Sequence, residues 1–299
     1  MDLLSIDDLS DAEIATILAQ AQSWFEFNRQ PRRNDRRLDG LTILNAFFEN
    51  STRTLLSFEI AAKRLGAQMV TMQVEHSSIK KGETLDDTAR TLNAMRPDCL
   101  VIRHGTSGAP RSVSGIMDCP VINAGDGTGE HPTQALLDAA TLMHRFGRIE
   151  GLKVAICGDL AHSRVSRSNR KLLRRLGAEV RLAGPPSLLP DNFDGSGSID
   201  EAVDGADVIM MLRIQRERLE AELNDAPGEY LERYGLTAER MKRAALGAVV
   251  MHPGPINRGV EIDGALADDP ARSLIILQVE MGVAVRMACL DLITAERLG

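Results

Sequence analysis

Hydroxyl groups and one guanidinium are concentrated at residues 51–54, where the sequence reads Ser-Thr-Arg-Thr. An apolar run typical of a buried strand, residues 41–48, precedes them, and a helical pattern begins among them. The first turn of a helix offers backbone N–H groups without intrahelical partners, together with the positive end of the helix dipole. Arg53 can add two parallel hydrogen bonds to a phosphate. The motif therefore predicts a phosphate site, although an ordinary Ser or Thr N-cap would have the same residue types.

Further polar side chains occur where other apolar runs end. They are Arg103, His131 with Gln134, Arg164, Arg213 with Gln215, and the tip His252-Pro253-Gly254-Pro255. The prolines of that tip have no N–H to donate and leave carbonyl groups free. Such a set suits two anionic substrates and a reaction that depends on orientation and charge stabilisation. The sequence offers no competing carboxylate pair, nucleophilic triad or metal-ligand cluster, so we predict neither a metal nor a cofactor.

The elements that must position these residues alternate along the chain. Strand-like runs are expected at 41–48, 67–74, 98–103 and 120–124, and again at 153–159, 178–183, 207–213 and 248–252. Helical patterns separate them. This alternation is typical of parallel sheets with helices on both faces, where ligands gather beyond the carboxyl ends of the strands. The predicted fold class is α/β, with two doubly wound parallel-sheet domains and an active-site cleft between them.

The predicted domain boundary lies in the glycine-rich segment that leads into His131. The first domain is predicted to span residues 1–132 and the second residues 133–281. The final stretch, residues 274–298, has the pattern of one strongly amphipathic helix. We expect its part from residue 282 to 299 to cross back and complete the first domain.

Composition excludes several classes of protein. The 299 residues are 43% hydrophobic and 26% charged, and no segment has the apolar length that spans a bilayer. A net charge of -7 argues against general nucleic-acid binding, yet a cleft on an acidic protein can still be locally positive. The acidic amino terminus does not resemble a signal peptide, which predicts a cytoplasmic location. The four cysteines are scattered and are expected to be buried thiols.

Five dispersed motifs resemble the carbamoyltransferase family and follow one another in the family's order. They are FENSTRTLLSFE at 48–59, HPTQALLD at 131–138, GDLAHSR at 158–164, LRIQRER at 212–218 and HPGPINRG at 252–259. Within the family, the similarity is to the catalytic chains that use aspartate. It implies transfer of the carbamoyl group from carbamoyl phosphate to the amine of L-aspartate. The products would be N-carbamoyl-L-aspartate and phosphate, an early step of de novo pyrimidine biosynthesis.

The same resemblance implies which residues bind carbamoyl phosphate. The phosphate group would be held by Ser51, Thr52, Arg53, Thr54 and Arg103. Thr54, Arg103 and His131 would donate to the carbonyl oxygen, where negative charge builds in the tetrahedral intermediate. Gln134 and the carbonyls of Pro253 and Gly254 would orient the carbamoyl nitrogen.

For aspartate, the resemblance implies that Arg164, Arg213 and Gln215 take the two carboxylates. Ser77 and Lys81 resemble loop residues that enter the active site of a neighbouring subunit, where Lys81 would contact aspartate and take part in catalysis. A homotrimer is therefore implied as a functional requirement. Whether regulatory or dihydroorotase-like chains join it is left open by the sequence.

Three alternatives differ in their demands on the sequence. A carbamoyltransferase for ornithine would be expected to carry a cysteine in the tip at 252–255, which reads HPGP here. A catalytically silent scaffold relative would be expected to lack site residues, and none of the expected set is missing. A dinucleotide-binding protein would need G-x-G-x-x-G spacing after Ile156, which is absent from CGDLAHSR.

Overall fold

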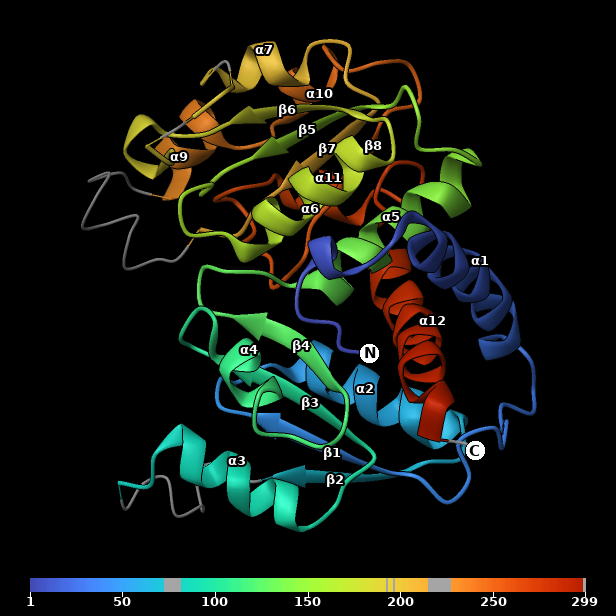
Figure 1. The fold of residues 1–299 in the computed structure, drawn as a ribbon. Coiled ribbons are helices and arrows are strands. Elements are labelled where there is room, and N and C mark those ends of the chain that lie inside the picture. The colour runs from blue at the N-terminus through green and yellow to red at the C-terminus, as the bar shows by residue number, and fades with distance from the viewer. Residues whose placement is uncertain (73–81, 192, 196, 215–226, 298–299) are drawn as a thin grey trace. The chain divides into compact units, whose positions relative to one another are not determined.

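The computed structural model describes residues 1–72, 82–191, 193–195, 197–214 and 227–297 (Figure 1). The chain forms two compact units. One comprises residues 1–140 with 279–299, and the other comprises residues 141–278. The chain passes from one unit to the other within two helices, α5 (Pro132–Phe146) and α12 (Ile275–Thr294).

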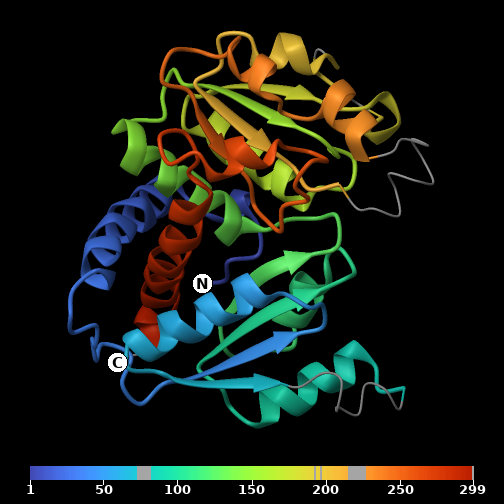
Figure 2. The same cartoon turned by 180° about the vertical axis from the view of Figure 1, so that it is seen from behind.

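A four-stranded parallel sheet forms the centre of the first unit. Its strands are β1 (Thr42–Phe47), β2 (Gln68–Met72), β3 (Cys99–His104) and β4 (Val121–Asp126), in the order β2-β1-β3-β4. Helices α3 (Leu85–Ala94) and α4 (Ala109–Ser114) cover one face, where Leu44, Ala46 and Leu100 meet Ala89 and Val113. Figure 2 shows α2 (Thr52–Arg64) and the carboxyl-terminal part of α12 on the opposite side. Before β1 come a short 3-10 turn (Ile6–Asp8) and α1 (Asp11–Asn28).

The second unit repeats this plan. Strands β5 (Lys153–Cys157), β6 (Glu179–Ala183), β7 (Val208–Met211) and β8 (Val249–Met251) are parallel, in the order β6-β5-β7-β8. Its helices are α6 (Arg164–Arg175), α7 (Ile199–Val203), α9 (Pro227–Tyr234), α10 (Ala238–Met241) and α11 (Gly264–Asp268), with a 3-10 turn at Pro186–Leu188. The buried core joins alternate residues of β5 and β7, including Ala155 and Ile209, to Ala202 of α7 and Met241 of α10.

All eight predicted strands are present, and the predicted α/β class with two parallel sheets is confirmed. In each sheet the first strand along the chain lies between two others. Strand β1 lies between β2 and β3, and β5 lies between β6 and β7. A strand order that reverses in this way is the point where ligands bind in doubly wound sheets.

The carboxyl-terminal helix does cross back to the first unit, but its predicted amphipathic character is wrong. From Met281 to Leu290 only Val283 is more than slightly exposed. The reason is that the first unit surrounds this part of α12: Arg286 lies over the ring of Phe58 in α2, and Gly282 faces Leu137 of α5. A helix packed on several sides is apolar all round. The 3-10 turn Ala295–Arg297 ends the described chain.

No helix in the described part of the chain is both long enough and apolar enough to span a membrane.

Candidate functional site

The helix α2 begins with an N-cap that differs from the others of its kind. Ser51 occupies the N-cap position with an extended backbone (φ -156), but its side chain makes no capping hydrogen bond. In the described residues, every other serine or threonine N-cap accepts a hydrogen bond from the first turn of its helix. These are Ser5, Ser10, Thr84, Ser163, Ser198 and Thr237. The alternative interpretation of residues 51–54 as an ordinary cap therefore lacks the bond that defines such a cap.

The rest of the first turn of α2 presents polar groups from an anchored helix. Thr52 and Arg53 are exposed, while Thr54 is buried and its carbonyl accepts a hydrogen bond from the Ser57 hydroxyl at 3.0 Å. Phe58 and the residues one and two turns further on are fully buried, which fixes the helix against its unit. The amino-terminal end of α2 thus combines a positive dipole end with hydroxyl and guanidinium groups.

Arg103 lies at the same edge of the sheet as the start of α2. Phe47, the last residue of β1, pairs with Arg103 in β3, and the Phe48 N–H donates to the Arg103 carbonyl at 2.8 Å. The Arg103 side chain, 14% exposed, donates to the Ala124 carbonyl at 3.3 Å, and its Nε lies 3.3 Å from Glu49 Oε2. The sheet thus brings Arg103 close to the turn that leads into α2, as the sequence predicted for parallel strand ends.

His131 and Gln134 are held at the start of α5 by a tightly bonded turn. Asp126 accepts hydrogen bonds from the Glu130 N–H at 2.7 Å, the Gly108 N–H at 2.6 Å and the Asn123 amide at 3.0 Å. His131 and Gln134 are both buried, and the Gln134 amide donates to Asp138 at 3.0 Å. Asp126 therefore sets where the chain enters α5.

Arg286 of α12 is a charged residue of this unit that the sequence interpretation missed. It is buried, donates to the Gly282 carbonyl at 3.0 Å, and lies 5.1 Å from the centre of the Phe58 ring. Burial lowers the pKa of its guanidinium to about 10, and the charge of Arg103 acts in the same direction, against the opposing influence of Asp138. The signal in the sequence was a lone arginine within the apolar run 281–290.

In the second unit, Arg164 and Arg213 follow neighbouring strands. Arg164 begins α6 after the Ser163 N-cap, and β5 leads into this segment. Arg213 follows β7, which pairs with β5, and the Leu212 N–H donates to the Cys157 carbonyl at 2.8 Å. Arg213 is exposed, whereas the next residue, Ile214, is fully buried. The two guanidinium groups therefore come from adjacent strand ends of one sheet.

The tip after β8 is also at this edge, because β8 pairs with β7. Pro253 and Gly254 are partly buried, and Gly254 has a left-handed backbone (φ 68) that other residues rarely adopt. His252 is buried, and its ring contacts Glu261 through Nε2 at 3.1 Å and the Gly254 N–H through Nδ1 at 2.8 Å. The sequence interpretation had singled out the tip but not its partner Glu261.

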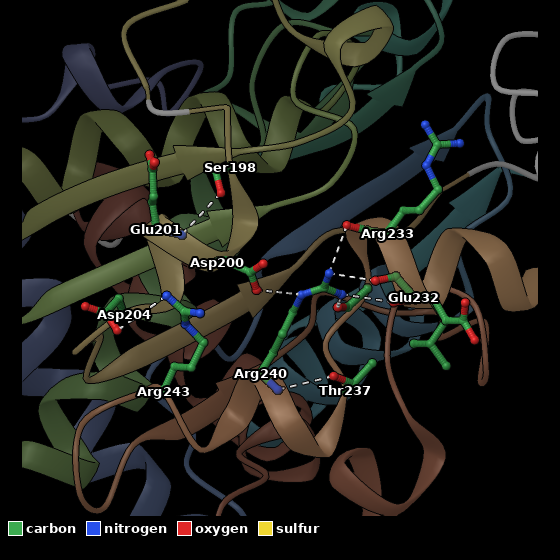
Figure 3. A network of polar contacts seen from close by, with 11 residues as sticks. Ser198, Asp200, Glu201, Asp204, Glu232, Arg233, Thr237, Arg240 and Arg243 are labelled. Carbon is green, nitrogen blue, oxygen red and sulfur yellow. Dashed lines mark hydrogen bonds and ion pairs between the residues drawn. The ribbon is translucent and has the colours of Figure 1, made fainter.

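Arg240 is the centre of a network of polar contacts with α7 and the end of α9 (Figure 3). The Arg240 guanidinium contacts Asp200 of α7 at 2.9 Å. It also donates to the carbonyls of Leu231, Glu232, Arg233 and Gly235 at the end of α9. Helix α9 in turn places Tyr230 in a buried cluster with Ile214. One arginine therefore satisfies the terminal carbonyls of a helix that packs next to a predicted aspartate-binding residue.

The predicted site residues thus fall into two groups. Ser51, Thr52, Arg53, Thr54, Arg103, His131 and Gln134 belong to the first unit, and Arg164, Arg213, Pro253 and Gly254 to the second. Ser77, Lys81 and Gln215 lie outside the described residues. That the two groups share one cleft stays a prediction. Among the residues that the structure describes, no three His, Cys, Asp or Glu side chains are grouped so as to hold a metal ion.

Comparison with known families gives two matches that together span most of the chain. Residues 1–144 match the aspartate/ornithine carbamoyltransferase carbamoyl-P binding domain, and residues 150–293 match the Asp/Orn binding domain of the same family.

Curated relatives are similar over nearly their whole length. The aspartate carbamoyltransferase catalytic subunit of Rhizorhabdus wittichii is 59% identical, over 99% of this chain and 96% of the relative. That of Novosphingobium aromaticivorans is 56% identical, over 98% and 89%.

Solved structures show the same fold. Aspartate transcarbamoylase from Trypanosoma cruzi in complex with carbamoyl phosphate has a TM-score of 0.86 at 32% identity, covering 97% of this chain and 94% of that one. Ornithine carbamoyltransferase from Pyrococcus furiosus has a TM-score of 0.87 at 29% identity, covering 98% and 97%. The fold is therefore common to enzymes that use aspartate and to enzymes that use ornithine.

Proposed function

The chain belongs to the aspartate/ornithine carbamoyltransferase family, and from that premise we propose how its residues divide the work of the reaction. It transfers the carbamoyl group of carbamoyl phosphate to the amine of L-aspartate, giving N-carbamoyl-L-aspartate and phosphate. The observation that carries aspartate over ornithine is the identity of 59% and 56%, over almost the whole chain, with catalytic subunits named for aspartate. This activity implies a place in the pyrimidine pathway.

Carbamoyl phosphate is bound by the first unit. The phosphate group is held at the amino-terminal end of α2 by Ser51, Thr52, Arg53 and Thr54, with Arg103 as a further cation. The Ser51 side chain makes no capping hydrogen bond to the first turn of α2, which supports this assignment. Its hydroxyl and the N–H groups of that turn can then bind phosphate oxygens. The exposed position of Arg53 on an anchored helix supports it as well.

Charge stabilisation is the main catalytic effect. The unprotonated amine of aspartate attacks the carbamoyl carbon, and the carbonyl oxygen gains negative charge as a tetrahedral intermediate forms. Thr54, Arg103 and His131 donate hydrogen bonds to that oxygen, while Gln134 and the carbonyls of Pro253 and Gly254 orient the carbamoyl nitrogen. The C–O bond to phosphate then breaks, and the leaving phosphate accepts the proton that the amine loses. No covalent enzyme intermediate is needed.

Aspartate is bound by the second unit. Arg164 and Arg213 take its two carboxylates, assisted by Gln215, since a planar guanidinium matches a carboxylate in a two-pronged geometry. The two arginines follow neighbouring strands of one sheet, β5 and β7, which supports this pairing. The Trypanosoma cruzi enzyme, 32% identical to this chain, has been solved with aspartate and phosphate and with N-(phosphonacetyl)-L-aspartic acid. This likeness supports aspartate as the ligand.

The working assembly is a homotrimer in which Ser77 and Lys81 complete the site of a neighbouring subunit, with Lys81 contacting aspartate. An exposed apolar surface on the first unit supports self-association. Leu56 and Ile60, which lie one turn apart on α2, are 46% and 40% exposed. Exposed apolar side chains gathered on one face mark association surfaces. The four buried free thiols support a reducing, cytoplasmic location.

A direct assay tests the proposed function. Purified protein is given carbamoyl phosphate with either L-aspartate or L-ornithine, and both phosphate and the carbamoylated amino acid are measured. We expect equal amounts of phosphate and N-carbamoyl-L-aspartate, and negligible product with ornithine. Product with ornithine would support the alternative specificity, and no product with either amine would support a catalytically silent relative.

A further inference from the structure

We propose that His252 and Glu261 form a buried positioning pair, which aims the carbonyls of Pro253 and Gly254 at the carbamoyl nitrogen. This inference rests on the proposed function, because it concerns how the same site orients one substrate. Neither residue is a catalytic residue here, since each acts through the backbone of the tip after β8. The argument depends on the tautomer of His252, on the anchors of the tip, and on the chemistry of the groups that are buried.

The hydrogen bonds of His252 define its tautomer. The Gly254 N–H lies 2.8 Å from Nδ1, so Nδ1 must be the acceptor and carries no proton. A neutral imidazole then carries its proton on Nε2, which donates to Glu261 Oε1 at 3.1 Å. Both side chains are 0% exposed. The carboxylate of Glu261 therefore selects the imidazole form that can hold the Gly254 amide.

The tip is fastened on both sides of the two carbonyls. The His252 N–H donates to Gln278 Oε1 at 3.0 Å, and the Asn257 N–H donates to the same Glu261 oxygen at 2.6 Å. Between these anchors, the Gly254 N–H is turned inward to His252. A peptide group has its N–H and C=O on opposite sides, so fixing the N–H of Gly254 also fixes the direction of the Pro253 carbonyl.

Glu261 also links the tip to the segment that carries Arg213. The Asn257 side chain, whose backbone is held by Glu261, donates to the Ile214 carbonyl at 2.8 Å. Ile214 follows Arg213 directly. One buried carboxylate therefore sets the geometry of both the carbamoyl-facing carbonyls and the strand end beside a proposed aspartate ligand.

A turn of this length does not need a buried ionisable pair to be stable. Burying a carboxylate is costly unless its oxygens are all paired, and Glu261 Oε2 is buried with no hydrogen-bond partner in the described part of the chain. A purely structural turn could use apolar residues at the same place. The presence of a buried ionisable pair at this turn is explained if the pair orients groups that bind substrate.

Two substitutions of His252 separate its two hydrogen bonds. An Asn side chain places an oxygen near the position of Nδ1, so His252→Asn can keep an acceptor for the Gly254 N–H. A Gln side chain places its amide near Nε2, so His252→Gln can keep the contact to Glu261 but loses the Gly254 acceptor. Ser198→Ala, which removes an N-cap of α7 in the same unit, controls for general destabilisation.

Carbamoyl phosphate and acetyl phosphate are the paired probes. Acetyl phosphate has a methyl group where carbamoyl phosphate has an NH₂, so it cannot donate to the Pro253 and Gly254 carbonyls. We expect His252→Gln to lower kcat/KM for carbamoyl phosphate by about 10- to 100-fold, as other lost supporting contacts do. Its inhibition constant for acetyl phosphate and its KM for aspartate should stay within about threefold of wild type. His252→Asn should recover most of the loss, and Ser198→Ala should change neither ligand's value.

An equal loss for both phosphate ligands, or equal defects in the Asn and Gln variants, would overturn the proposal. If His252→Gln does not fold, Glu261→Gln gives the same comparison between the two phosphate ligands. A loss for carbamoyl phosphate without a matching loss for acetyl phosphate supports the pair, and either an equal loss for both or no loss for carbamoyl phosphate overturns it. Failure of the proposed function is recognised separately, because wild-type protein would then form no N-carbamoyl-L-aspartate at all.

Discussion

At the scale of single residues, the charged and polar groups at strand ends were visible in the sequence, whereas their buried supports were not. Arg103, Arg164 and Arg213 each follow an apolar run, and parallel strands must end at one edge of a sheet. The Glu261 partner of His252 could not be predicted, because the two residues meet only when the chain from 252 to 261 folds back. Arg286 was missed because burial is a property of the packed unit.

The buried thiols give a first prediction. Burial raises the pKa of Cys119 to about 11 and those of Cys157 and Cys289 to about 12, and it raises the pKa of Cys99 well above its usual value. Only the thiolate reacts with a disulfide reagent, so native protein at pH 8 should react far more slowly than denatured protein. Ellman's reagent should detect four thiols after denaturation and very little in the same time before it. Rapid labelling of native protein would contradict this burial.

The same shifts predict how stability depends on alkaline pH. Because folding raises the pKa of Cys157 above its ordinary 9.0, the unfolded chain loses that proton first as the pH rises through about 9. The folded state then holds more protons than the unfolded state, so stability falls with rising pH. Each such thiol should lower the free energy of unfolding by roughly 1 kcal/mol between pH 8 and pH 10.

Urea unfolding of wild type and Cys157→Ala across this pH range measures that contribution. The variant should lose less stability between the two pH values, whatever its stability at pH 8. An equal loss of stability in wild type and variant would show that folding does not raise the pKa of Cys157.

At the scale of elements, the strands were the most predictable feature and the last helix the least. Buried parallel strands are short apolar runs between polar tips, so their positions follow from the sequence directly. The exposure of α12 depends on what packs around it, and Phe58 and Leu137 lie far from it in the chain. The absence of a capping hydrogen bond from Ser51 could not be predicted either, because the sequence of residues 51–54 does not determine the rotamer of the serine side chain.

The N-cap of α2 gives a prediction at this scale. Ser51→Ala should change the free energy of unfolding by less than about 0.5 kcal/mol, because no capping bond is lost. Ser10→Ala, in the same unit, removes a capping box and should cost about 1 kcal/mol. The effects on activity should be reversed: Ser51→Ala should lower kcat/KM for carbamoyl phosphate by about tenfold, and Ser10→Ala should not. Chemical denaturation and initial-rate assays measure the two quantities.

A large stability loss in Ser51→Ala with unchanged kinetics would mean that Ser51 is an ordinary cap. The phosphate assignment of the α2 terminus would then lose its main structural support.

At the scale of the whole molecule, the two repeated sheet units follow from the alternation of strand-like and helical segments. The proposed trimer depends instead on which side chains are exposed on the folded surface. The alternation of strand-like and helical segments does not predict that exposure. Its structural support is the pair of exposed apolar side chains Leu56 and Ile60, which lie one turn apart on α2.

A charge on that surface should separate the subunits. Leu56→Glu combined with Ile60→Glu should give a monomer in sedimentation velocity experiments and should abolish most activity, because Ser77 and Lys81 of a neighbour could no longer complete the site. Leu246→Glu is the matched control, since Leu246 is 106% exposed but belongs to the second unit. That variant should remain trimeric and active. A fully active monomeric double variant would refute the shared site.

The central claim is that one unit binds the phosphate end of carbamoyl phosphate and the other binds the carboxylates of aspartate. Steady-state kinetics of Arg53→Ala and Arg213→Ala, with each substrate varied in turn, tests it most directly. Arg53→Ala should lower kcat/KM for carbamoyl phosphate and weaken inhibition by inorganic phosphate, each by at least about tenfold. Arg213→Ala should chiefly raise the KM for aspartate, by at least about tenfold, with phosphate inhibition unchanged. Equal, mild effects of both substitutions on both substrates would contradict the account.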